Sequence, residues 1–242
     1  MESLKDIVSD IRIFLYGGIL TLPLTIAGTL SILGLFTANY AIMFFLLGFL
    51  VLAPLTSTII DKVLTSLLEG KSFNPFKGKT SDVCKVIIPY SMLPVASGQD
   101  TSVISTNWTA MVAFFVGYIF TNGLELYNRE TIDTTINVTS SSASDLNTMV
   151  TNRKSQAIIA MISVIVFALI VFGFRFYTGC ESTLGMILTT IGFIFMGHGW
   201  YKALSKVGQD RLSDLFGIAN RLLPPSAINN APIACVPVPS SN

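Results

Sequence analysis

Apolar residues along the chain gather into five long stretches, with polar residues between them. The stretches cover residues 13–36, 40–60, 106–126, 155–174 and 182–201. A helix needs about 20 predominantly apolar residues to cross a bilayer, because each residue adds about 1.5 Å and the hydrocarbon core is about 30 Å thick. The pattern therefore predicts an all-α membrane protein, with about five transmembrane helices in a domain that covers residues 13–204.

The third stretch, residues 106–126, is the least apolar of the five. Thr121, Asn122 and Glu125 are among the polar residues that interrupt it, although residues 110–120 are firmly apolar. Polar and small side chains are common where transmembrane helices contact one another. We therefore expect this helix to face its neighbours rather than lipid.

The other stretches have features of lipid-facing helices with defined ends. Residues 155–174 are apolar around the whole helix and stop at Arg175, a charge expected at an interface. Residues 182–201 end in the pair Trp200-Tyr201, which suits headgroup depth. The second stretch contains Pro54, which we expect to kink its end because proline removes a helical hydrogen bond.

Three segments flank or separate the spans. Residues 1–12 are predicted to form an amphipathic interfacial helix, and residues 205–242 an extended, proline-containing tail. Residues 131–151 are dominated by Ser, Thr, Asn and Asp, which predicts an exposed loop. Asn137 lies in a sequon there and is a candidate for glycosylation. The apolar face of the interfacial helix comprises Leu4, Ile7, Val8, Ile11 and Phe14.

Charge excludes some function classes and leaves the orientation open. The chain is 51% hydrophobic and 12% charged, and its 15 Lys and Arg barely exceed its 14 Asp and Glu. This balance provides no basic surface for nucleic acid. The five-span topology puts eight Lys and Arg on one side and seven on the other, so the positive-inside rule does not choose between orientations. The sequon favours an exoplasmic or lumenal position for the side that carries residues 128–154.

Metal and cofactor sites are not predicted. The three cysteines, Cys84, Cys180 and Cys235, are scattered, and no Cys/His cluster has the spacing of a metal site. Whether Cys84 and Cys180 pair is open. We therefore expect no cofactor.

Three blocks at one predicted membrane face resemble the signature motifs of the type-2 phosphatidic-acid phosphatase superfamily. They are Asn74-Pro75, Ser105-Thr-Asn-Trp108, and the segment from Arg175 to Glu181. The family blocks read Arg-Pro after a Lys, Pro-Ser-Gly-His at the start of a helix, and Arg with a His six residues later. The resemblance covers roughly residues 55–204 and implies a phosphatase-like helical bundle.

The resemblance also implies that the catalytic groups are missing. The family uses a His nucleophile, a second His as general acid and base, and Lys and Arg to hold the phosphate. By position, Asn74 replaces the first-block Arg, Trp108 the acid-base His and Glu181 the nucleophile, whereas Arg175 is retained. An indole does not relay protons, and a carboxylate repels phosphate. We therefore predict a vestigial phosphate pocket in which Arg175 more plausibly pairs with Glu181 than binds phosphate.

The chain has one histidine, which excludes a mechanism that requires two. His198 lies 17 residues beyond Glu181 on the same predicted helix, or about 25 Å along its axis. We expect it near the opposite membrane face, as an interfacial or helix-packing imidazole beside Trp200.

The leading hypothesis is a non-catalytic membrane protein with a structural or interaction role. Degenerate members of this phosphatase family occur in large eukaryotic DNA viruses. The resemblance therefore implies a protein of a virion internal membrane or envelope that contacts the capsid or other membrane proteins. The alternatives are a lipid phosphatase with rewired chemistry and an anionic-lipid-binding protein that uses the pocket around Arg175.

Overall fold

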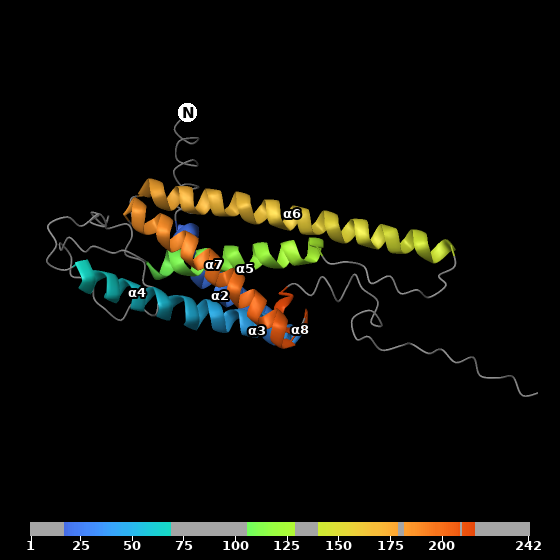
Figure 1. The fold of residues 1–242 in the computed structure, drawn as a ribbon, viewed down its shortest axis with the longest axis horizontal. Coiled ribbons are helices and arrows are strands. Elements are labelled where there is room, and N and C mark those ends of the chain that lie inside the picture. The colour runs from blue at the N-terminus through green and yellow to red at the C-terminus, as the bar shows by residue number, and fades with distance from the viewer. Residues whose placement is uncertain (1–16, 69–105, 129–139, 179–181, 209, 216–242) are drawn as a thin grey trace, which may run out of the picture.

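A computed structural model describes residues 17–68, 106–128, 140–178, 182–208 and 210–215. All the regular structure in these ranges is helical (Figure 1). The helices are α2 (Leu22–Thr37), α3 (Tyr40–Leu47), the π-helical turn η1 (Gly48–Leu52), α4 (Ala53–Leu68), α5 (Asn107–Asn128), α6 (Ser140–Thr178), α7 (Thr183–Gly208) and α8 (Asp210–Ser213).

Four helical segments are long and apolar enough to cross a membrane: Tyr40–Leu67, Asn107–Asn128, Thr151–Tyr177 and Thr183–Gly208. They match the second to fifth predicted spans, and the first of them runs through α3, η1 and α4. The first predicted span, residues 13–36, falls mainly on α2, which is apolar but has only 16 residues. Residues 13–16 lie outside the described ranges, so a fifth span stays a prediction.

A tight turn joins α2 to α3. Ala38 has a left-handed backbone with φ 48°, and the Asn39 N–H donates to the Gly34 carbonyl at 3.2 Å. The Asn39 side chain caps α3 by accepting from the Ala41 N–H at 2.9 Å. Gly34 allows α2 and α3 to approach closely at this turn, because a Cβ there would lie 2.9 Å from the Ile42 side chain. These local features return the chain directly along α2.

The predicted kink at Pro54 takes the form of a π-helical turn. The helix runs through Pro54 to Leu68, and η1 occupies the turn just before it. Proline lacks an N–H and its ring collides with the carbonyl four residues earlier, so a local widening of the helix accommodates it. The wider turn also places Gly48 against α7, where a Cβ would lie 2.6 Å from the Trp200 indole nitrogen.

Helix α5 lies at the centre of the bundle, between α7, α6 and the α3–η1–α4 segment (Figure 1). In its most apolar window 78% of the residues are buried, against 17% for the α6 span. Phe45 of α3 contacts the Tyr118 ring with centroids 4.9 Å apart, and Phe167 of α6 packs on Phe115 at 6.1 Å. The prediction that this polar span faces its neighbours is confirmed.

Two predicted boundaries are wrong. Residues 140–151 were expected in a loop, but α6 begins at Ser140 and has 39 residues. Serine costs a helix only about half a kcal/mol per residue, and an established apolar helix extends readily through such a run. Residues 205–208 continue α7, and residues 210–215 pack on the bundle instead of starting an extended tail. The predicted interfacial helix, Asn137 and residues 216–242 lie outside the described ranges.

Candidate functional site

Two of the four predicted pocket residues meet where α5 begins and α6 ends. The Arg175 guanidinium carbon lies 4.7 Å from the centre of the Trp108 ring. Both side chains are buried, Trp108 to 1% and Arg175 to 4% relative exposure. The Trp108 indole N–H also donates to the Leu20 carbonyl at 3.0 Å. Asn74 and Glu181 lie outside the described residues, so their position and the predicted Arg175–Glu181 pair are not tested.

This arrangement gives Arg175 a structural role. A guanidinium over an indole face is attracted to the ring quadrupole, by about 2 kcal/mol or more when the pair is out of water. Because Trp108 is bound to Leu20 as well, the indole holds the start of α5, the end of α6 and the chain before α2 together. The ring nitrogen of Trp108 is a donor only, so it has no capacity to accept a proton from a substrate.

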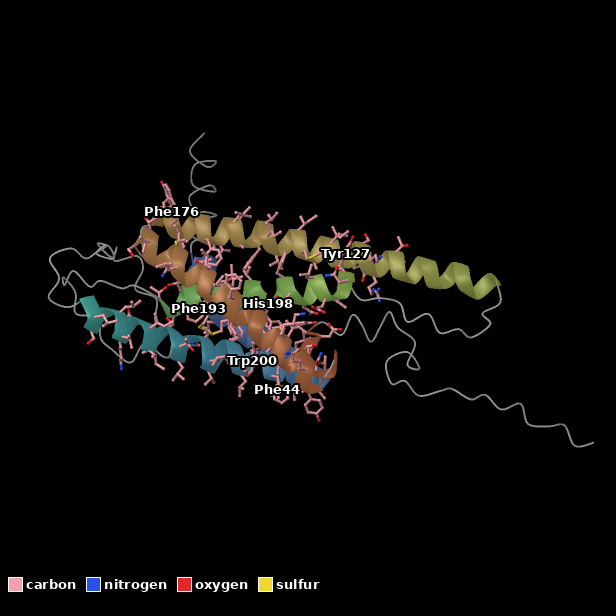
Figure 2. The ribbon with its side chains drawn as sticks, in the orientation of Figure 1. Phe44, Tyr127, Phe176, Phe193, His198 and Trp200 are labelled. Carbon is pink, nitrogen blue, oxygen red and sulfur yellow. The ribbon has the colours of Figure 1, made fainter. Side chains whose placement is uncertain are left out.

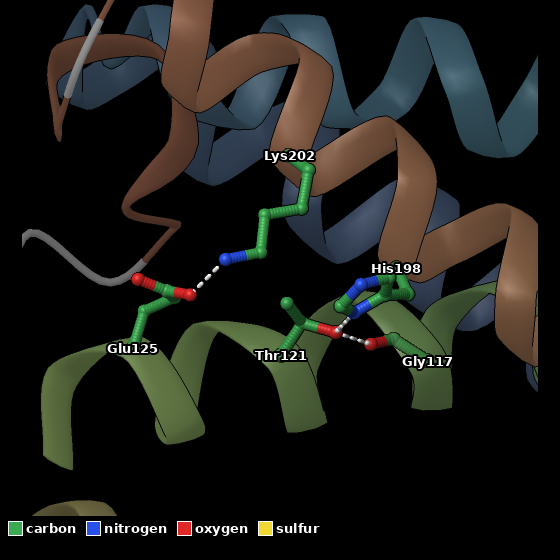
Figure 3. A network of polar contacts seen from close by, with 5 residues as sticks. All are labelled: Gly117, Thr121, Glu125, His198 and Lys202. Carbon is green, nitrogen blue, oxygen red and sulfur yellow. Dashed lines mark hydrogen bonds and ion pairs between the residues drawn. The ribbon is translucent and has the colours of Figure 1, made fainter. Parts of the chain in front are cut away.

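His198 lies at a different level of the bundle. Its Nδ1 is 3.0 Å from the Thr121 hydroxyl oxygen, and that hydroxyl donates to the Gly117 carbonyl at 2.7 Å (Figure 3). Thr121 is 13 residues along α5 from Trp108, which is about 20 Å. The exposed imidazole therefore reaches from α7 to α5 and is far from Arg175.

An ion pair that the sequence analysis did not foresee lies one helical turn further along. The Lys202 ammonium contacts the Glu125 carboxylate (Figure 3). Their side chains are 44% and 39% exposed, so the pair lies at the bundle surface. A signal was present in the sequence, because Thr121 and Glu125 are four residues apart and so are His198 and Lys202. On facing parallel helices this equal spacing lets Thr121 contact His198 and Glu125 contact Lys202.

Aromatic side chains also make contacts at the end of the bundle where Glu125 and Lys202 lie. The Trp200 indole N–H donates to the Phe44 carbonyl at 3.1 Å, where α7 meets α3 (Figure 2). The Lys154 ammonium lies 5.8 Å from the centre of the Tyr127 ring, where α6 passes the end of α5. Tyrosine and tryptophan favour the membrane–water interface.

The two ends of the bundle are separated by the thickness of a bilayer core. From Lys154 to Arg175 along α6 there are 21 residues, or about 32 Å, and the residues between them are uncharged. From Ser182 to Lys202 along α7 there are 20 residues, or about 30 Å. Both lengths match the hydrocarbon thickness of about 30 Å. The contacts of Trp108, Arg175 and Leu20 mark one face, and those of Glu125 and Lys202 the other.

No group of three or more His, Cys, Asp or Glu side chains that could hold a metal ion occurs within the described ranges.

Comparisons with known proteins found no relative of this chain. No family model matches the chain, and no curated protein or solved structure is similar to it. The resemblance to type-2 phosphatidic-acid phosphatases therefore rests on the sequence blocks alone.

Proposed function

We propose that this chain is a non-catalytic, multi-spanning membrane protein with a structural or interaction role. The observation that carries the proposal is the separation of the two groups that phosphoryl transfer would need together. His198 contacts Thr121, about 20 Å along α5 from the indole that holds Arg175. An imidazole at that distance cannot reach a phosphate bound at Arg175, because proton or phosphoryl transfer requires contact at about 3 Å.

The length of α6 supports an interaction role. Its 39 residues extend about 58 Å, nearly twice the hydrocarbon thickness. Its apolar span begins near Thr151, so residues 140–150 continue the helix past the end of α5 (Figure 1). A helix that projects from the membrane offers a surface for proteins outside the bilayer. In this proposal such a partner is a capsid or another membrane protein, and a viral membrane is the setting that the sequence resemblance implies.

Arg175 favours one second candidate, the binding of an anionic lipid without hydrolysis. The guanidinium is at the membrane boundary, where lipid phosphates lie, and arginine forms bidentate hydrogen bonds with phosphate. The guanidinium carbon lies 4.7 Å from the centre of the Trp108 ring, and this contact holds the group at the same end of α5.

The test is phosphate release from phosphatidic acid by the purified protein in phosphatidylcholine nanodiscs. We expect no release above protein-free discs. Release that Arg175→Ala abolishes and Lys154→Ala, at the opposite membrane face, leaves unchanged would overturn the proposal in favour of a phosphatase. Native mass spectrometry of the same samples distinguishes the second candidate, which requires co-purified anionic lipid that disappears only in Arg175→Ala.

A further inference from the structure

We draw no further inference here: the strongest candidate, the buried amide oxygen of Asn122 on the central helix α5, which makes no hydrogen bond within the described part of the chain, is a single polar atom with nothing in the described residues to show what binds it.

Discussion

The closest approach in the bundle is between α5 and α7, and it depends on two glycines. A Cβ at Gly197 would collide with the Phe114 carbonyl oxygen and lie 2.9 Å from the Tyr118 nitrogen. A Cβ at Gly117 would collide with the Ile194 carbonyl group and lie 2.8 Å from its Cα. The obstacles are backbone atoms, which move only with the whole helix. We therefore expect Gly197→Ala to force α5 and α7 apart.

The magnitude follows from the size of that separation. Ordinary contact starts at 3.4 Å, and the Phe114 carbonyl oxygen would be even closer than the Tyr118 nitrogen, so the helices must part by about 1 Å. A gap of roughly 0.5–1 Å removes a quarter to a half of the dispersion attraction between facing atoms. Overpacking of this kind costs about 1–3 kcal/mol, and helix propensity returns up to about 1 kcal/mol. We therefore expect Gly197→Ala to lower the free energy of unfolding by about 1–2 kcal/mol.

A matched control lies on the same helix. Gly192 has nothing within 4 Å of a would-be Cβ, so Gly192→Ala gains helix propensity without a collision. We expect it to be neutral or stabilising by up to about 1 kcal/mol. The double variant Gly117→Ala/Gly197→Ala should cost less than the sum of the single changes, because one separation accommodates both methyl groups. The assay is reversible unfolding by SDS in mixed micelles, followed by circular dichroism. Equal stabilities for Gly197→Ala and Gly192→Ala would refute the reasoning.

Three further variants probe the ends of α5 and its contact with α8. Trp108→Phe keeps a ring for the guanidinium but removes the hydrogen bond to Leu20, so we expect a loss of about 1–2 kcal/mol in the same unfolding assay. Tyr118→Phe removes the 2.9 Å hydrogen bond to the Ser213 carbonyl, and faster hydrogen exchange in residues 213–215 should report it. Glu125→Gln breaks a half-exposed ion pair with lysine, so its cost should stay within about 1 kcal/mol and shrink as salt is added.

Hydrophobic patterning predicted the spans because length and polarity are local properties of the sequence. The polarity of residues 106–126 predicted correctly that this helix lies among its neighbours. The pattern failed at residues 140–151, where polar composition indicated a loop. A helix that leaves the membrane needs no apolar residues to continue, so hydropathy marks the end of the span and not the end of the helix.

A residue of the candidate site could be placed from the sequence only where its position along a single helix was enough to decide. Helical spacing put His198 far from Arg175, and the contact with Thr121 agrees with that expectation. The sequence blocks predicted Trp108 and Arg175 in one pocket, but not the contact between the guanidinium and the indole ring, because that contact depends on the antiparallel register of α5 and α6. The Glu125–Lys202 pair was missed for a similar reason, since it depends on the parallel register of α5 and α7.

The placement of Arg175 and His198 at opposite membrane faces is the claim on which the account depends most. Single cysteines test it at Tyr177 and Val207, which are 83% and 81% exposed, in a background without the native cysteines. The measurement is labelling by a membrane-impermeant maleimide in vesicles of uniform orientation. The account predicts that one site is labelled from outside and the other only after the vesicles are opened. Labelling of both sites from the same side would contradict it.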